Sequence, residues 1–276
     1  MRKVERSVTV GFIVVLLSYV ETFGGVPLNN VEGVGGIAFN PLAYPANKDS
    51  TFDPNGIGKI FGKPQIGAWY INLGQSHVNW TTLSVSETFF KRLELSYGHE
   101  IIAPKGHGIA KDNIGAKLLL IEENAWDNPW VPVLSAGIIG KHTTQVGHGI
   151  DSTGYDFYLV ASKLITQLPK PVLLSGGILS TNGRATGVLG YDDDRDETFF
   201  GNIDVLPRED LAVGFEYKQG ARFSDFKNAD YWDAHVAWFI NKNLTLVGAY
   251  VNAGNEKSTS KVGFGQGLVL SIQYAF

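Results

Sequence analysis

The chain has 276 residues, 33 glycines, 12% aromatic residues and no cysteine, a composition that favours tightly turned strands over helices. Because cysteine is absent, structural disulfides, cysteine-ligated zinc, iron–sulfur clusters and thiol catalysis are excluded. The formal net charge of −4 provides no basic footprint for nucleic acid. We therefore expect an all-β protein with no nucleic-acid partner and no cofactor.

The N-terminus, residues 1–24, has the pattern of a cleavable signal peptide. Arg2, Lys3 and Arg6 precede an apolar stretch, Val8–Val20, that is shorter than the ~20 residues of a membrane-spanning helix. Cleavage is predicted before Gly25, and an uncleaved N-terminal anchor is the alternative. Export leaves three locations open: the periplasm, the cell exterior and the outer membrane.

The next segment, residues 25–63, is rich in glycine, proline and asparagine and has no sustained periodicity. It is predicted to be irregular, with one short strand near Val34–Phe39. Glycines let a backbone pass close to a wall, so this segment is a candidate plug for the lumen of a barrel.

The remaining chain, residues 64–276, contains twelve strand-like runs bounded by turn residues. Most of them have about the ~9–11 residues that a tilted strand needs to cross hydrocarbon. The runs are Gln65–Leu73, Val78–Glu87, Lys91–Ile101, Ile114–Glu122, Val131–Lys141, Tyr155–Ile165, Val172–Thr181, Thr198–Leu206, Asp210–Gln219, Ala229–Ile240, Leu244–Asn252 and Gly265–Phe276.

Several runs alternate apolar and polar residues, which places each set on one face of a sheet. The polar face is predicted to turn toward a lumen, because charges on a lipid-facing surface are costly. The candidate lumen-lining residues are Arg92, Glu94, Glu216, Lys218, Asp233 and His235. Packed structural pairs and a water-filled channel both explain these residue types, and the sequence leaves the two alternatives open.

The C-terminus has a distinct pattern of its own. Five alternating residues share one face and end at the last residue, namely Leu268, Leu270, Ile272, Tyr274 and Phe276. This pattern looks like the terminal strand signal that the barrel-assembly machinery recognises. A chain that ends in its last strand must pair that strand with the first, because an open sheet edge cannot face lipid.

The connections between the runs differ in length. Short turns join the second run to the third, the eighth to the ninth and the tenth to the eleventh, whereas long polar loops such as 142–154 and 182–197 fall on the opposite side. Outer-membrane barrels have this asymmetry, with short periplasmic turns and long extracellular loops. We therefore predict an antiparallel transmembrane β-barrel of about twelve strands in the outer membrane of a Gram-negative bacterium.

Two segments resemble known families. Residues 24–45 read GGVPLNNVEGVGGIAFNPLAYP, which resembles the opening signature of a proteobacterial outer-membrane β-barrel family of unknown function. Residues 199–252, with connections Leu-Pro-Arg-Glu-Asp and Asn-Lys-Asn, are more distantly similar to YjbH-like barrels linked to exopolysaccharide production. These resemblances imply location and architecture, and they supply no catalytic residues.

One loop contains the residue types of a hydrolase. His142 and His148 lie in one predicted outer loop with Asp151, Ser152 and Thr153 nearby, and a serine–histidine–aspartate triad is recognised by geometry rather than chain order. A solvated polar loop is the other interpretation, because nothing in the sequence holds these groups against one another.

The segment Asp192–Glu197 is an acidic cluster in the longest predicted loop. Clustered carboxylates suit Ca²⁺, but the spacing lacks the glycine and the distal glutamate of an EF-hand. Solvated repulsive charge is one interpretation, and a divalent cation bridging the loop to lipopolysaccharide is the other.

Three functions fit this architecture. The first is a narrow pore or conduit for small solutes or exopolysaccharide, and the second is a non-transporting structural or adhesive barrel that acts through its outer loops. The third is an outer-membrane hydrolase, although no catalytic residues are assigned and a non-enzyme is expected. Expected partners are outer-membrane lipid and lipopolysaccharide, the barrel-assembly machinery and envelope polysaccharide.

Overall fold

The fold is known from a computed structural model that describes residues 28–276, apart from 54, 105–107, 256 and 258–259. The predicted signal peptide lies outside the described residues. In the described ranges, no helix combines the length and the hydrophobicity that a membrane span requires.

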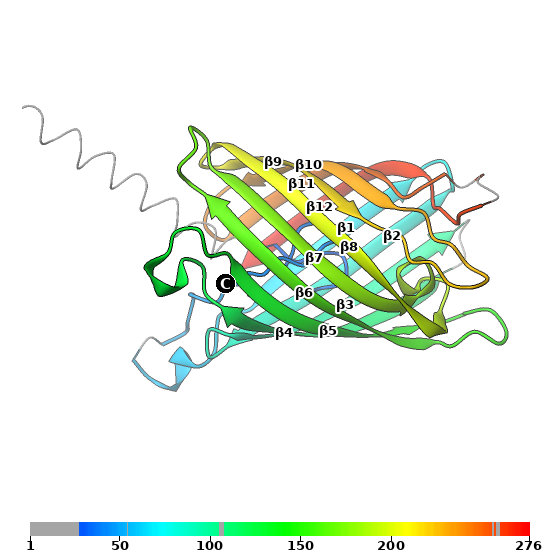
Figure 1. The fold of residues 1–276 in the computed structure, drawn as a ribbon, viewed down its shortest axis with the longest axis horizontal. Coiled ribbons are helices and arrows are strands. Elements are labelled where there is room, and N and C mark those ends of the chain that lie inside the picture. Colours follow the sequence, from blue (N-terminus) through cyan, green and yellow to red (C-terminus); the bar gives the residue numbers. More distant parts are fainter. Residues whose placement is uncertain (1–27, 54, 105–107, 256, 258–259) are drawn as a thin grey trace, which may run out of the picture.

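The described chain forms one closed antiparallel barrel of twelve strands, which confirms the predicted fold class (Figure 1). In the described residues, a short 3-10 helix, η1 (Ile57–Lys59), precedes the first strand, and two more lie in connections between strands, η2 (Ala125–Asp127) and η3 (Arg184–Gly187). The strands are β1 (Gln65–Leu73), β2 (Val78–Phe89), β3 (Leu93–Pro104), β4 (Ile109–Ile121), β5 (Val133–Thr143), β6 (Thr153–Ile165), β7 (Val172–Gly183), β8 (Tyr191–Arg208), β9 (Leu211–Lys218), β10 (Tyr231–Phe239), β11 (Leu244–Asn252) and β12 (Gln266–Ala275).

Each strand pairs with its neighbours in sequence, and β1 closes the barrel by pairing with β12. The register of this closing pair runs from Gln65↔Ala275 to Asn72↔Leu268. Closure leaves no unpaired edge among the twelve strands, so the backbone polar groups of the wall bond to one another. We call the end of the barrel where β1 begins and β12 ends the terminal end, and the opposite end the far end.

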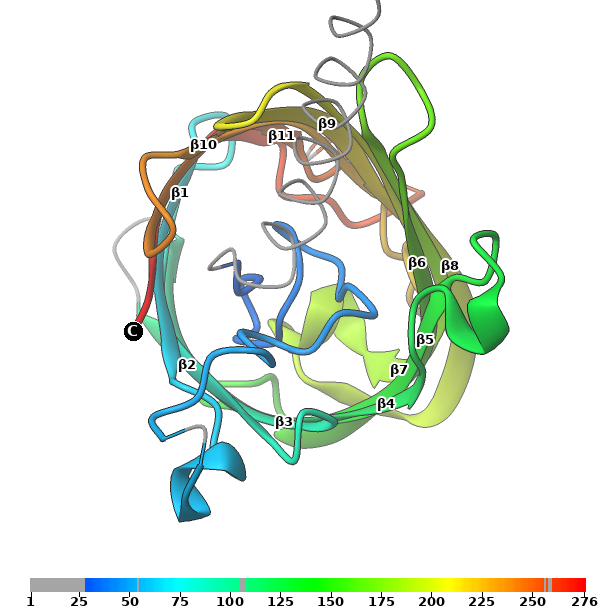
Figure 2. The same cartoon turned by 90° about the vertical axis from the view of Figure 1, so that its left-hand side faces the viewer.

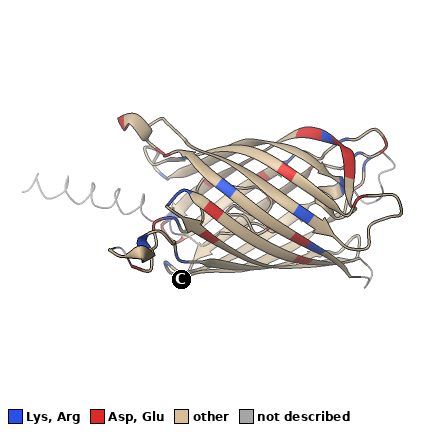
Figure 3. Cartoon of the chain, turned by 90° about the horizontal axis from the view of Figure 1, so that it is seen from below, with Lys and Arg blue, Asp and Glu red and all other residues tan. Residues whose placement is uncertain are grey.

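The wall has an apolar outer surface and a polar inner surface. On β12, Leu268, Leu270 and Ile272 are 65%, 62% and 52% exposed, whereas the alternating Ser271 and Gln273 are buried. Acidic and basic positions are interspersed along the wall (Figure 3). This arrangement is the inverse of a water-soluble domain, and it suits a surface in contact with hydrocarbon.

Several strands extend beyond their predicted ends, mainly toward the far end. Strand β8 begins at Tyr191, so the acidic segment Asp192–Glu197 is strand rather than loop. Its ladder with β7 runs to Thr181↔Asp196 and, after a register shift, to Gly183↔Tyr191. The consecutive aspartates therefore lie in a bulge between these two pairs.

The predicted short strand at Val34–Phe39 is wrong. This stretch has only isolated bridges, Asn29↔Gly35 and Gly36↔Pro41, because the chain folds back on itself within a few residues. It lies inside the barrel and adds no strand to the wall.

The apolar outer surface generates a prediction for membrane insertion. Leu270→Arg, at the middle of β12, is expected to destabilise the folded barrel in phospholipid vesicles, lowering its free energy of unfolding by about 2–4 kcal/mol, because a charge would face hydrocarbon. Urea titration in vesicles measures this change. The control is Leu168→Arg, in the connection between β6 and β7, where the side chain is 47% exposed. Equal losses in both variants would contradict a lipid-facing outer surface.

Candidate functional site in the barrel lumen

An irregular stretch, residues 28–47, fills the interior of the barrel, and we call it the plug (Figure 2). Asn29, Asn40 and Ala43 are completely buried. The plug turns at Asn30, whose side-chain Oδ1 accepts hydrogen bonds from the N–H groups of Glu32 and Val34, both at 3.0 Å. In the described ranges, every backbone–backbone hydrogen bond of the plug stays within residues 28–50. The plug is therefore held to the wall through side chains.

The first of these attachments is the buried pair Glu94 and Lys117, whose charged groups are 2.8 Å apart. Glu94 accepts hydrogen bonds from the N–H groups of Gly35 at 2.8 Å and Ala46 at 2.7 Å. Lys117 Nζ lies 2.9–3.1 Å from three plug carbonyls, those of Gly35, Leu42 and Tyr44. Charge-assisted bonds to backbone groups are stronger than neutral ones, so this pair clamps both arms of the plug.

The second attachment is made by Glu216 of β9. The two carboxylate oxygens of Glu216 accept the N–H groups of Phe39 and Asn40, both at 2.8 Å. The Asn40 side chain in turn donates to the wall carbonyls of Gly201 at 3.2 Å and Tyr217 at 3.0 Å. These contacts fix the middle of the plug without adding it to the sheet.

A third attachment joins the start of the plug to the closing strands. Gln273 Oε1 accepts the N–H of Asn29 at 3.0 Å, and Trp69 Nε1 donates to the Asn29 carbonyl at 2.8 Å. Gln65 Nε2 and the Ser86 hydroxyl both donate to the side-chain oxygen of Asn29, at 2.6 and 2.7 Å. Asn29, near the start of the plug, is thus bonded to β1, β2 and β12.

The apex of the plug carries a carboxylate, that of Glu32. Its Oε1 accepts hydrogen bonds from Lys111 Nζ, at 3.0 Å, and from Lys141 Nζ. Each lysine also pairs with a wall carboxylate, Lys111 with Glu100 at 2.9 Å and Lys141 with Asp156 at 2.5 Å. Burial alone would raise the pKa of Glu32, but the ammonium groups of Lys141 and Lys111 outweigh burial and hold that pKa well below its ordinary value.

At the apex, the backbone of the plug packs directly against the backbone of β3. Gly33 has a φ of +92°, and a Cβ there would lie 2.8 Å from the backbone of Tyr97. Across from it, a Cβ on Gly98 of β3 would lie 2.6 Å from the Glu32 carbonyl oxygen. Only glycine on both sides allows this approach.

The structure places five of the six lumen-lining candidates inside the barrel and buried: Glu94, Glu216, Lys218, Asp233 and His235. His235 lies between two carboxylates, with its ring nitrogens 2.7 Å from Asp204 and from Asp233. The sixth candidate, Arg92, was placed wrongly. It is exposed in the turn between β2 and β3, where its guanidinium donates to the Leu119 carbonyl at 3.2 Å.

Several buried charged residues of the lumen are not among the residues predicted from the sequence. The missed residues are Glu32, Glu100, Lys111, Lys117, Lys141, Asp156 and Asp204. For Lys111 the reason is the strand boundary, because β4 begins five residues before its predicted start at Ile114. Lys117, on the same strand, follows Lys111 at an even spacing and shares its inward face. That two-residue period could have identified both lysines.

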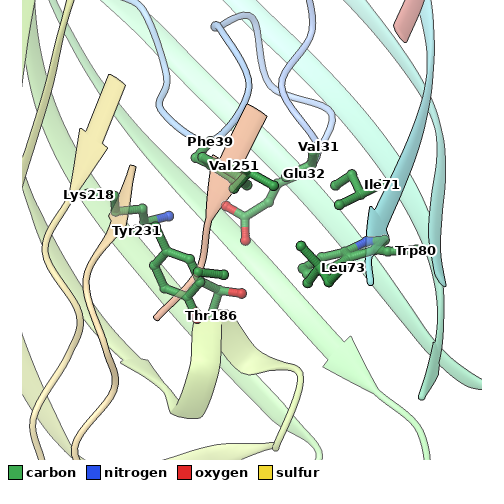
Figure 4. A pocket seen from close by; sticks show the side chains of 11 residues that line it. Val31, Glu32, Phe39, Ile71, Leu73, Trp80, Thr186, Lys218, Tyr231 and Val251 are labelled. Carbon is green, nitrogen blue, oxygen red and sulfur yellow. The ribbon is translucent and has the colours of Figure 1, made fainter. Parts of the chain in front are cut away.

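A small cavity of about 20 Å³ separates the plug apex from the far-end connection that contains η3 (Figure 4). Glu32 and Lys218 line it together with Thr186 of η3 and with Trp80. The Trp80 Nε1 is buried and has no hydrogen-bond partner in the described part of the chain. This volume holds about one water molecule. The lumen at this level is therefore filled almost completely.

The hydrolase candidates do not form a triad. His142 Nδ1 lies 3.4 Å from the Thr153 hydroxyl, an exposed and long contact, and pairs with no carboxylate in the described residues. His148 is exposed in the connection between β5 and β6. In the acidic segment, Asp192 pairs with Arg184 at 2.6 Å. The described residues include no group of three or more histidines and carboxylates arranged for a metal.

A protein-family model matches nearly the whole chain. The chain belongs to the family described as a protein of unknown function, DUF3034, whose model matches residues 25–273. No curated protein matches the sequence.

Solved structures with a similar fold include outer-membrane porins. A KdgM porin superposes with a TM-score of 0.51 at 14% identity, covering 77% of this chain and 99% of that one. A KdgM porin in complex with disordered oligogalacturonate gives a TM-score of 0.53 at 12% identity, with the same coverage. The COG4313 outer-membrane channel from Pseudomonas putida F1 gives a TM-score of 0.43 at 13% identity, covering 78% of this chain and 96% of that one. At these identities the likeness concerns the fold.

The glycine contact at the apex generates a prediction for the plug. Gly98→Ala is expected to increase amide hydrogen exchange in the plug at least several-fold, because the added methyl group would collide with the Glu32 carbonyl. Exchange in β3 itself should change little. Gly248→Ala is the control, since a Cβ there meets nothing within 4 Å. Unchanged plug exchange in Gly98→Ala would contradict the close approach.

The low pKa of Glu32 generates a prediction for pH. A depressed folded pKa contributes stability above the ordinary carboxyl pKa of about 4.3, and that stability is lost only as the pH falls toward the folded value. The protection that Glu32 adds to the plug is the difference in exchange between the protein and Glu32→Gln, after correction for intrinsic rates. This difference should be constant from about pH 7 to about pH 5 and should shrink in stronger acid. Glu32→Gln should exchange faster at neutral pH, and the two proteins should converge in strong acid. A difference that already vanishes near pH 6 would contradict the assignment.

Proposed function

We propose that the protein is a conduit in the outer membrane of a Gram-negative bacterium, closed in this structure by its own plug. The observation that supports this proposal is the mode of attachment: the plug bonds to the wall through side chains, while its backbone bonds stay within residues 28–50. Water or a solute can replace side-chain contacts without breaking the wall. The plug can therefore leave while the barrel remains closed on itself.

The size of the barrel is consistent with a narrow conduit. Twelve strands lie between small barrels, which side chains alone fill, and porins of 16–18 strands, which hold an open channel. Here the wall side chains leave enough room for some twenty residues of additional chain. The fold shared with the KdgM porin supports the same proposal. Small solutes and exopolysaccharide, the latter suggested by the distant similarity to YjbH-like barrels, are the candidate cargoes.

A second segment narrows the lumen at the far end. The connection between β7 and β8 folds inward, so that Ala185, Gly187 and Val188 are buried. The Thr143 hydroxyl holds it by donating to the Gly187 carbonyl at 2.8 Å. We call residues 184–189 the inward loop. An open conduit requires that both the plug and the inward loop move.

A non-transporting barrel is the alternative function. The dense ion pairing inside the lumen favours it, because a filled and satisfied interior also serves a purely structural barrel or an adhesin. The hydrolase reading has no supporting geometry in the described residues.

Removing the plug and the inward loop, which we call the two closures, separately and together tests the conduit. Four proteins are compared in vesicles: the mature chain, a form that lacks residues 25–47, a form whose inward loop is replaced by a short Gly-Ser linker, and the combination. We expect liposome swelling by small neutral sugars to be lowest for the mature chain and highest for the combination, at least tenfold above the mature chain. Circular dichroism and heat-modifiable migration verify that each barrel is folded. A folded combination variant that passes no sugar would exclude the conduit and leave the structural barrel.

A further inference from the structure

Three ammonium groups converge on the apex of the plug from three different strands. Lys111 lies on β4, Lys141 on β5 and Lys218 on β9, and all three are buried. They surround one carboxylate of the plug, that of Glu32, to which two of them are hydrogen bonded. Buried charges need partners, so a cluster of this kind requires an anion at its centre.

The charges of the wall at this level do not balance without the plug. Lys111 is paired with Glu100 and Lys141 with Asp156, but Lys218 takes part in no ion pair within 4 Å in the described ranges. Three ammonium groups and two wall carboxylates leave one surplus positive charge. Glu32 supplies the one negative charge that neutralises it.

The cavity beside Glu32 provides a second, independent observation. Lys218 extends into it from one side, and Trp80 lines the other side (Figure 4). These two side chains are only 7% and 6% exposed. In the described ranges, the Lys218 ammonium group forms no ion pair and the Trp80 indole N–H has no hydrogen-bond partner, and both residues line the same cavity. This is the environment of an acceptor group.

We propose that Lys111, Lys141 and Lys218 form a binding site for the carboxylate of an anionic solute, and that Glu32 occupies this site as an internal substitute in the closed state. This inference rests on the proposed conduit and adds a class of solute and a means of opening. A solute that carries one carboxylate competes with Glu32, and displacement of Glu32 releases the plug apex from the wall. Glu100 and Asp156 flank the site, so a group with two or more negative charges is disfavoured.

The absence of cysteine makes a single engineered thiol a specific reporter. Val31 is 3% exposed and lines the cavity beside Glu32. In Val31→Cys the thiol is shielded while the apex is seated, and it reacts with a membrane-impermeant maleimide when the apex leaves. The probes are glucuronate, glucose and glucosamine, which have similar sizes and charges of −1, 0 and +1. Sodium chloride equalises the ionic strength in every sample.

We expect labelling of Val31→Cys to be at least fivefold faster in glucuronate than in glucose or glucosamine. Adding Lys218→Gln should remove most of this difference, whereas the control Lys170→Gln, an exposed lysine in the connection between β6 and β7, should preserve it. Adding Glu32→Gln should give fast labelling in all three sugars. Equal rates in glucuronate and in glucose with chloride would overturn the proposal, and so would a glucuronate effect that survives Lys218→Gln.

The result can be separated from the test of the conduit. If the form that lacks both closures passes sugars but glucuronate does not accelerate labelling, the conduit stands and the carboxylate site is refuted. If glucuronate accelerates labelling but that form passes no sugar, the carboxylate site stands in a barrel that does not transport.

Discussion

Pairing of β1 with β12 is the constraint on which the rest of the structure depends. Once the sheet closes on itself, the backbone groups of the twelve strands are bonded within the wall, and only side chains distinguish its two surfaces. Alternate residues must then point either outward or into a confined interior. The outward set is apolar, so the polar side chains gather inside, where they need partners other than bulk water.

The plug supplies those partners through its backbone. Glu94 and Glu216 accept N–H groups, and Lys117 donates to carbonyls, so wall charges are satisfied by peptide groups as well as by one another. Desolvating an ion pair costs several kcal/mol per ion, and hydrogen bonds of this kind offset that cost. The same contacts give the plug one register within the barrel. Glycines at 33 and 98 permit the approach that this register requires.

The two closures differ in how they are held. The plug combines many side-chain contacts with its own internal turns, whereas the inward loop places Ala185 and Thr186 at φ values of 52° and 57°. Left-handed backbone costs a non-glycine residue about 1–2 kcal/mol, so the inward loop stays in place only because its contacts, including the bond from Thr143, outweigh that strain. Both closures meet the cavity that Glu32, Lys218 and Thr186 share. Movement of one therefore removes packing from the other.

The amino-acid sequence by itself determined the twelve strands, their inward and outward faces and the inward position of residues such as Glu94 and His235, because a two-residue period is a local property of the chain. It did not determine which charges meet. The cluster of Glu32 with Lys111 and Lys141 joins residues 79 and 109 positions apart, and only closure of the barrel around the plug brings them together. Arg92 shows the same limit, since an error of two residues in the start of β3 moves this side chain from the predicted lumen to a turn. The two-residue period fixes whether a side chain points into the lumen or outward. Which charged groups come into contact depends on strand register and on the path of the plug, which are properties of the folded chain.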